Sequence, residues 1–517
     1  MPRSRRMKNF PLLIRASAVS MWMLGTLLTA SAATESTATR ASVVRSQGPS
    51  EDQCGGALEA EIWALWDSQG RTNLRKELIG TRLLGQGDTY ALYDIQIYFH
   101  NLEAMAERCQ RVDRLMQLAD DLMPAFDALQ PLSEQSPADI GWVCKGGAVC
   151  NARNKLINKE VMLVSVQGLG LMSALAGALA RSPDAQARAH PFVRRTVKTA
   201  VAHLRRWGGS TARLNWQRLT GAKSQDSKDA SSALLFTDKP LWLLAIYANL
   251  AGIGARQPDL LQDIGLTRTV QRDLAQNIDL LLRLFKARVT LSTRDSLELG
   301  RVMVADMDRG FWSLHPDYRY AGYEGAERPA TCRDGAYGSA QLLMNAKSIK
   351  PVSVGWDFSH ARRLVQVMSA LDLNAQALRT WYALSPSAIP PSDLAKAFAA
   401  QLLVAIWNGN VQAPLFKNYW GGFNGWYRVA YDDGRGRCVG GIPPFGLSDS
   451  FVTGGYADWA RYYPKIHELA LNVLKLSKSD QTDDQQFIRT HYKGLSDVAS
   501  PANRMLNQLM FWPSLIQ

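Results

Sequence analysis

Apolar side chains recur along most of this 517-residue chain with the spacing of helices. The clearest stripe places them three or four positions apart over 270–285, which predicts a helix with one buried face. A second helix is expected to begin after an N-cap at Ser392 and to end at Asn408-Gly409. The same spacing predicts further helices near 56–78, 90–126, 155–181, 189–206, 230–254, 336–347, 359–371, 374–384, 453–475 and 482–491.

The predicted helices are of two kinds. Some, such as 162–179 and 241–247, are apolar nearly all round, whereas 270–285 is apolar on one side only. This mixture indicates inner helices enclosed by outer ones, and roughly twelve helices in hairpin-like succession predict an all-α fold, the (α/α)6-type toroid or six-hairpin barrel. A helical solenoid is the rival architecture, but we find no repeat of about 34 to 47 residues. Polar residues within each apolar segment exclude a transmembrane bundle.

The N-terminus has the three parts of a secretory signal. Basic residues near the start precede an apolar run from Ala16 to Ala30, and Ser31-Ala32-Ala33 offers small residues for cleavage. An uncleaved anchor is the alternative, although Arg15 and Ser20 keep the apolar run short of a spanning helix. We therefore expect a signal peptide at 1–33, a flexible leader at 34–50, a single (α/α) toroid catalytic domain at 51–517, and a periplasmic or secreted protein.

Charge and cysteine content agree with export. The formal charge of +13 includes five basic residues of the predicted signal, which leaves +8, a mild basicity that suits an acidic ligand or an anionic envelope surface. The sequence has no basic block with interleaved aromatics, so nothing in it indicates binding to nucleic acid. No stable membrane insertion is expected after signal removal. All six cysteines lie after the signal, and an even number in an exported chain predicts disulfides. Cys144 and Cys150 form the best pair, and Cys332 with Cys438 is a further possibility.

Two long segments break the helical rhythm, and loops of this length are often functional. The first runs from Ala305 to Arg333 and the second from Gly409 to Gly455, and both are rich in aromatic and acidic residues. We expect them to lie at one rim of the toroid. Aromatic faces bind the apolar faces of sugars, and carboxylates and guanidinium groups bind their polar groups. The alternative is that the aromatics only close the open end. The predicted substrate-binding residues are Trp312, Tyr320, Trp356, Trp420, Trp426, Tyr427 and Arg428.

Between the two loops lies Gly355 to Arg363, with the sequence Gly-Trp-Asp-Phe-Ser-His-Ala-Arg-Arg. Asp357 or Ser359 is expected to cap the helix that follows. A carboxylate at a helix start is favoured in its ionised form, which suits a general base or an electrostatic stabiliser. The alternative is a cap with no chemistry.

Two reactions fit these residues. Glycosidic hydrolysis needs two carboxyl groups, one charged and one protonated, for which Asp357 and Glu324 are the candidates, with Asp308 and Asp449 as substitutes. β-Elimination on a uronic-acid polymer needs a base and a group that neutralises the substrate carboxylate. The candidates for these two roles in elimination are His360, Tyr427, Arg428 and Asn424. No sequence motif for a metal or an organic cofactor occurs.

In helical pattern and cleft composition the chain resembles the six-hairpin (α/α) toroid glycoside hydrolases and polysaccharide lyases. The segments that carry this resemblance are Gly355 to Arg363, Tyr419 to Tyr427 and Gly455 to Trp459. The resemblance implies an exported enzyme that cleaves a cell-envelope or extracellular polysaccharide or oligosaccharide, neutral or acidic, without a cofactor or metal. Hydrolysis is expected ahead of elimination. A non-catalytic polysaccharide-binding or export factor is the alternative from another class.

Overall fold

The computed structural model describes most of the chain beyond the predicted leader. The described residues are 50–134, 139–221, 236–307, 322–325, 327–332, 340–342, 355–429, 431–432, 438–496 and 498–517. The predicted signal peptide at 1–33 and nearly all of the leader therefore lie outside the described residues.

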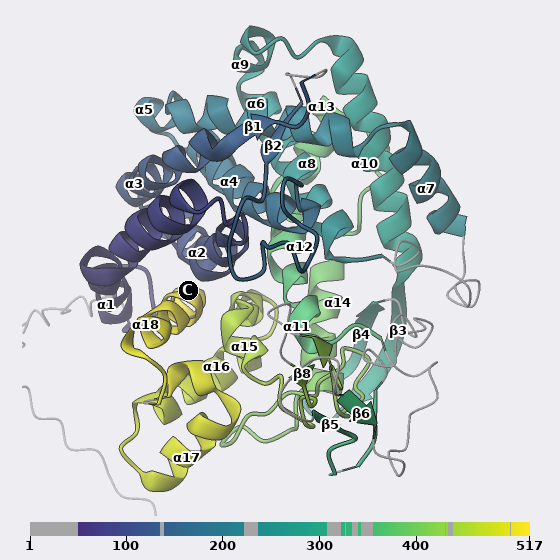
Figure 1. The fold of residues 1–517 in the computed structure, drawn as a ribbon. Helices are drawn as coiled ribbons and strands as arrows, with labels where there is room; N and C mark the ends of the chain where they lie inside the picture. The colour runs from purple at the N-terminus through teal and green to yellow at the C-terminus, as the bar shows by residue number, and fades with distance from the viewer. Residues whose placement is uncertain are drawn as a thin grey trace, which may run out of the picture. The chain divides into compact units, whose positions relative to one another are not determined.

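The described chain is mostly helical, as the sequence predicted (Figure 1). The α-helices are α1 (Ala57–Leu65), α2 (Tyr90–Arg108), α3 (Val112–Leu122), α4 (Met162–Arg181), α5 (Ala185–Arg188), α6 (Pro191–Trp207), α7 (Ser210–Gly221), α8 (Asp238–Arg256), α9 (Pro258–Asp263), α10 (Arg268–Arg288), α11 (Phe358–Ala361), α12 (Arg363–Leu373), α13 (Ala375–Trp381), α14 (Leu394–Gln401), α15 (Ser450–Thr453), α16 (Pro464–Lys478), α17 (Thr482–His491) and α18 (Pro501–Phe511).

Shorter or wider helical turns extend several of these helices. The π-helical turns are η1 (Trp66–Gly70), η2 (Asn73–Gly85) and η11 (Leu402–Ile406). The 3-10 turns are η3 (Met123–Ala128), η12 (Tyr456–Arg461), η13 (Lys493–Leu495) and η14 (Trp512–Leu515).

The described strands form four two-stranded antiparallel hairpins. Their members are β1 (Leu129–Pro131) with β2 (Ile140–Trp142), β3 (Val289–Ser296) with β4 (Gly300–Met307), β5 (Ala330–Cys332) with β6 (Ala340–Leu342), and β7 (Tyr431–Asp432) with β8 (Cys438–Val439).

Three sequence expectations need correction. The helix expected over 336–347 is wrong, because Ala340–Leu342 forms strand β6 and pairs with β5. The helix expected over 90–126 is divided, because Gln110 adopts a left-handed conformation with φ 54° between α2 and α3. The N-cap of α14 is Asp393 rather than Ser392. The helix predicted over 270–285 is confirmed as α10, whose N-cap Thr267 accepts a hydrogen bond from the backbone N–H of Val270.

The two kinds of helix expected from the sequence are both present. Nearly every side chain of α4 and most of those of α8 are buried, whereas α6 and α10 bury one face. Within the described chain, α4 is the one helix long and apolar enough to cross a membrane, and 83% of its most apolar window is buried inside the fold. Burial against other helices explains the composition of α4 without a membrane.

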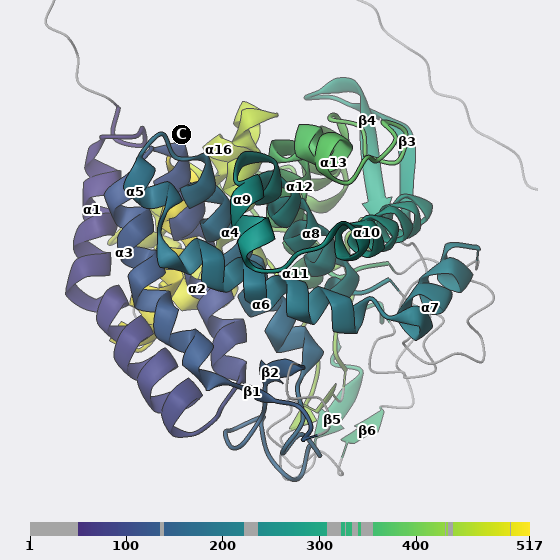
Figure 2. The same cartoon turned by 90° about the horizontal axis from the view of Figure 1, so that it is seen from above.

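Successive long helices pack against one another, and the two ends of the described chain meet. α4 contacts both α2 and α8, and α8 contacts α12. α18, close to the C-terminus, packs against α2, and Figures 1 and 2 both place its yellow ribbon beside the purple helices. Figure 2 shows the long β3–β4 hairpin extending from the end of α10. The final residues of β4 are buried, and the strand packs against α14.

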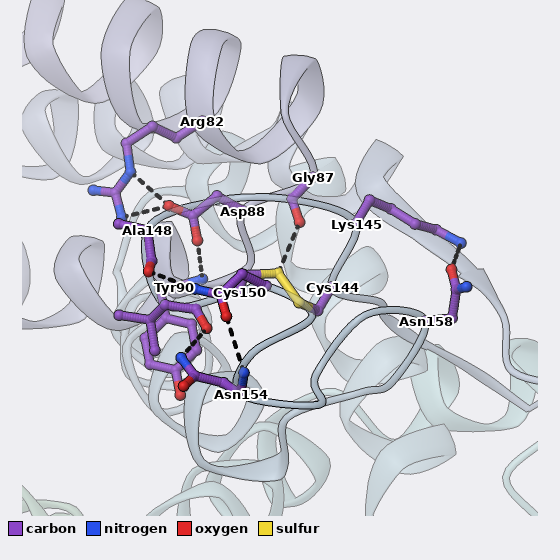
Figure 3. The surroundings of a disulfide bond; sticks show 12 residues. Arg82, Gly87, Asp88, Tyr90, Cys144, Lys145, Ala148, Cys150, Asn154 and Asn158 are labelled. Atoms are coloured by element: carbon purple, nitrogen blue, oxygen red, sulfur yellow. Dashed lines mark hydrogen bonds and ion pairs between the residues drawn. A yellow bond between two sulfur atoms is a disulfide. The ribbon is translucent and has the colours of Figure 1, made fainter. Parts of the chain in front are cut away.

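Two disulfides cross-link the N-terminal third of the described chain. Cys54 is bonded to Cys109, and Cys144 is bonded to Cys150, which confirms the predicted pair (Figure 3). The side chain of Cys332 lies outside the described part, so its proposed pairing stays a prediction. Both disulfides are compatible with an oxidising compartment.

Polar contacts hold the loop that carries the second disulfide. In Figure 3, Asp88 accepts hydrogen bonds from Arg82 and from the backbone N–H of Tyr90. The backbone N–H of Lys145 donates to the carbonyl of Gly87 on the neighbouring segment. The loop is therefore joined to the segment before α2 through the carbonyl of Gly87, whereas its disulfide closes the loop on itself.

Candidate active site at the start of α11

Asp357 is the N-cap of α11, as the sequence suggested. Its Oδ1 accepts hydrogen bonds from the backbone N–H groups of Ser359 and His360, each at 3.1 Å, and from the Ser359 hydroxyl. Its Oδ2 lies 2.6 Å from Nδ1 of His360. The residue is 0% exposed. One oxygen of the buried carboxylate therefore caps the helix, and the other pairs with His360.

The charge state of Asp357 follows from these contacts. Burial by itself raises the pKa of the carboxyl group, because desolvation penalises the charged form. The charge and hydrogen bond of His360, the charge of Arg428 and the hydroxyl of Ser359 together outweigh burial and hold the pKa below its usual range. The Asp357 carboxylate thus stays ionised beside Nδ1 of the His360 imidazole.

A tyrosine and an arginine complete the cluster. The Tyr427 hydroxyl lies 3.5 Å from Nδ1 of His360 and accepts a hydrogen bond from Nε of Arg428 at 3.0 Å. Burial raises the pKa of Tyr427 well above its usual value, and the charge of Asp357 adds to this effect, whereas Arg428 opposes it. Tyr427 therefore keeps its proton. We call Asp357, His360, Tyr427 and Arg428 the His360 cluster.

Backbone pairing brings the second long loop to the start of α11. Asp357 forms an isolated antiparallel bridge with Tyr419, and the N–H of Trp420 donates to the carbonyl of Trp356 at 2.6 Å. Further along the loop, Tyr427 exchanges two backbone hydrogen bonds with Ile442. These contacts explain how residues about 70 positions apart in sequence meet in one cluster.

The backbone at Arg428 departs from the common conformations. Its φ of 52° lies in the left-handed region, which non-glycine residues rarely adopt. The side chain nevertheless folds back over the Tyr427 ring, with its guanidinium carbon 5.2 Å from the ring centroid. Strained backbone is common in functional sites. Phe445 of the same loop shares this conformation with φ 61°, but only Arg428 adds a charge to the cluster.

The predicted sugar-binding aromatics that the structure describes lie inside the molecule. Trp356, Trp420, Trp426 and Tyr427 are all buried. Trp420 stacks against Phe358, and its Nε1 donates to the Ala305 carbonyl at 3.1 Å. These rings are therefore part of the core beneath the loop, and their predicted contact with a sugar stays a prediction. Trp312 and Tyr320 lie outside the described residues.

The predicted carboxylates are dispersed. Glu324 is exposed, and Asp308 lies outside the described residues. Asp449 stands at the start of α15, and burial raises its pKa to about 6, against the opposing charge of Arg362 and a backbone hydrogen bond from Gly494. The structure thus brings Asp357 together with His360, Tyr427 and Arg428, and it does not place Glu324 or Asp449 among the hydrogen-bond partners of that cluster.

Two asparagines of the second loop have structural roles. Asn424 accepts a hydrogen bond from the backbone N–H of Phe445 at 2.8 Å. Asn418, which the sequence reasoning missed, is fully buried, donates to the carbonyls of Gly425 and Pro443, and accepts from the N–H of Leu447. Its only sequence signal is a polar residue directly before a run of aromatics.

Comparison with known proteins does not assign the chain to a family. No family model matches the chain, and neither the curated proteins nor the solved structures include a significant match. Among the described residues, no group of three or more histidine, cysteine or acidic side chains is arranged to hold a metal ion.

Proposed function

We propose that this chain is an exported enzyme that cleaves an acidic polysaccharide by β-elimination, with His360 as the general base. The observation that carries the proposal is the contact of 2.6 Å between Nδ1 of His360 and the buried carboxylate of Asp357. A carboxylate at Nδ1 fixes the tautomer of the ring and stabilises the charge that the ring gains with a proton. Proton exchange with a substrate would then run through Nε2.

The other members of the His360 cluster fit the same reaction. In elimination His360 takes the proton next to the substrate carboxyl group, a double bond forms as the neighbouring carbon loses its bond to the glycosidic oxygen, and the proton held by His360 then passes to that leaving oxygen. A cation must offset the negative charge that develops at the carboxyl group. The Arg428 guanidinium, held at the Tyr427 hydroxyl, is a cation in the immediate surroundings of the imidazole. The buried Tyr427 positions Arg428 in this proposal rather than contacting the substrate itself.

Hydrolysis by paired carboxylates has less support. That reaction needs two carboxyl groups that can both reach the scissile bond. Asp357 is excluded from solvent and both of its oxygens are engaged by Ser359 and His360, whereas Glu324 is exposed. We therefore place elimination ahead of hydrolysis, in the reverse of the order that the sequence suggested.

The toroid and the export route belong to the same proposal. The contacts of α2 with α4 and α18, of α4 with α8, and of α8 with α12 place these helices in a row, and we propose that the row closes into a ring. The N-terminal pattern at 1–33 and the two disulfides support export to the periplasm or beyond. A single toroid domain over 51–517 remains our inference.

The decisive experiment exposes the purified mature chain to a panel of neutral and acidic polysaccharides and follows ultraviolet absorbance. Elimination creates a carbon–carbon double bond in the new non-reducing end, whereas hydrolysis does not. We expect absorbance to rise with a uronic-acid polymer, His360→Gln to abolish the rise, and Glu324→Gln to leave it unchanged. New reducing ends without absorbance, lost in Glu324→Gln, would establish hydrolysis instead. Binding without any product would establish a non-catalytic factor.

A further inference from the structure

A second polar site lies away from the His360 cluster, between the long helices. A cavity of about 310 Å³ is lined by the C-terminal parts of α2 and α12, together with residues of α4, α8 and η12. The His360 cluster stands before the first residue of α12, whereas the cavity lies along that helix as far as its last residue, Leu373. The two are therefore distinct places in the fold.

The cavity contains a buried carboxyl group with an unused oxygen. The Glu103 side chain is 3% exposed, and its Oε1 has no hydrogen-bond partner. Burial, helped by the nearby charges of Glu107 and Asp458 and opposed by Arg181, raises the pKa of Glu103 well above its usual value. A buried polar atom without a partner costs free energy, so its retention calls for an explanation.

Unused donor capacity faces the same space. Arg181 lines the cavity and donates from Nε to Glu107 at 2.6 Å, but its Nη1 is buried without a hydrogen-bond partner. Arg461, at the end of η12, donates to the hydroxyl of Ser369 at 3.0 Å and lies over the Tyr462 ring. Its charge acts to lower the pKa of Asp458 and of Asp372, although it forms no direct ion pair with a described carboxylate. Arg108, by contrast, is paired with Asp458 at 3.1 Å.

A chain of hydrogen bonds leads through the core to this cavity. Arg363 donates to Gln167, Gln167 donates to Gln96, and Gln96 bonds Nδ1 of His100. The other ring nitrogen of His100 lies 3.9 Å from Glu103, which is beyond hydrogen-bond distance. The hydrogen-bonded chain thus ends at His100, which lines the cavity beside Glu103, and Oε1 of Glu103 is left without a partner.

We propose that this cavity binds a small sugar acid, that is, a monosaccharide-sized hydroxy acid with one carboxylate. Of the arginines that line the cavity, Arg108 is paired with Asp458 and Arg181 with Glu107, which leaves the Arg461 guanidinium for a ligand carboxylate. The unused Glu103 and Arg181 groups supply hydrogen bonds to ligand oxygens. The volume is at the lower end for small-molecule pockets, about 300 Å³, which suits one sugar unit.

Direct binding tests the site independently of catalysis. Calorimetry on the mature chain would use D-glucuronate and D-galacturonate, with D-glucose as the neutral counterpart and acetate as the charge control. We expect the sugar acids to bind with a dissociation constant of about 1 mM or lower, and glucose and acetate to bind at least about tenfold more weakly. No heat with the sugar acids, or equal binding of glucose, would overturn the proposal and leave a water-filled cavity.

Variants then locate the ligand. Arg461→Gln and Glu103→Leu should each weaken sugar-acid binding at least about tenfold, whereas Arg272→Gln, on the exposed face of α10, should not change it. Glu103→Leu should also unfold at or above the wild-type temperature, because it removes an unpartnered buried polar group. His360→Gln should retain the binding that depends on Glu103 and Arg461, because His360 does not line the cavity. If His360→Gln abolishes binding while Glu103→Leu and Arg461→Gln retain it, the ligand occupies the His360 cluster and the proposal is wrong.

Discussion

Nδ1 of His360 lies 2.6 Å from Oδ2 of Asp357, three residues earlier at the cap of the same helix. The spacing makes the contact a consequence of the helix itself, because the N-cap side chain points back over the first turn. The same carboxylate therefore starts α11 and orients the imidazole. A change at Asp357 affects stability and chemistry together, whereas a change at His360 leaves the cap in place.

The two roles of Asp357 can be separated by paired variants. Asp357→Asn keeps the capping oxygen but loses the charge beside His360, so turnover should fall about 10²–10⁴-fold with little change in KM. The free energy of unfolding should fall by about 1–3 kcal/mol, because hydrogen bonds to a charged group are lost. His360→Gln should lose as much activity with a smaller loss of stability. Activity assays and urea unfolding of both variants check this.

The matched control is His491→Gln, which alters a histidine at the end of α17, outside the His360 cluster. It should retain wild-type turnover. Full turnover in Asp357→Asn would show that Asp357 is only a helix cap.

Asp449 should make stability depend on pH. Its folded pKa of about 6 lies above the unfolded value of about 4, so folding favours the protonated form. The stability linked to this proton is fully present below pH 4 and is lost as the pH rises through 6. Asp449→Asn cannot ionise, so its stability relative to the wild type should rise as the pH passes through these values and level off above pH 6 at a gain of about 3 kcal/mol at most. Thermal unfolding from pH 4 to 8 measures the difference.

Asp480→Asn provides the control for this titration, because Asp480 is exposed before α17. Its unfolding temperature should follow that of the wild type at every pH. A constant offset between Asp449→Asn and the wild type across the same range would refute the assigned titration.

The sequence predicted the helices well because their burial has a strong period. α10 and the capped start of α11 both follow from residues close together in the chain, as does the Cys144–Cys150 pair across a short loop. The β3–β4 hairpin was missed. Most residues of β3 are exposed on both faces, so the strand has no alternation of buried and exposed positions to signal it.

The candidate site was harder to predict because it depends on contacts across the chain. Asp357 and His360 were identified through their local pattern, but their meeting with Tyr427 and Arg428 requires the backbone pairing of Tyr419 with Asp357. The aromatic residues were assigned to a binding surface on composition alone. Composition does not distinguish a ring that lines a cleft from one that fills the core beneath it.

The two described disulfides should differ in what they contribute. Cys54 and Cys109 are separated by 55 positions and Cys144 and Cys150 by only 6. On the chain-entropy account, the longer closed loop restricts the unfolded chain more, so the bonds contribute about 4 and about 2 kcal/mol respectively. Urea unfolding of the double variants Cys54→Ala/Cys109→Ala and Cys144→Ala/Cys150→Ala compares them. A larger loss in the second variant would show that native-state contacts of the Cys144 loop dominate.

A variant of Trp420 tests whether this side chain packs in the core or binds a sugar. Its side chain is 0% exposed, stacks on Phe358 and Tyr456, and donates from Nε1 to the carbonyl of Ala305. Trp420→Phe should therefore lower the free energy of unfolding by about 1–3 kcal/mol, through the lost hydrogen bond and the space left behind, while KM stays within about twofold. Trp407→Phe, in a partly exposed position where Nε1 donates to Asn410, should cost less. A raised KM at unchanged stability would instead show that Trp420 binds the substrate, as the sequence suggested.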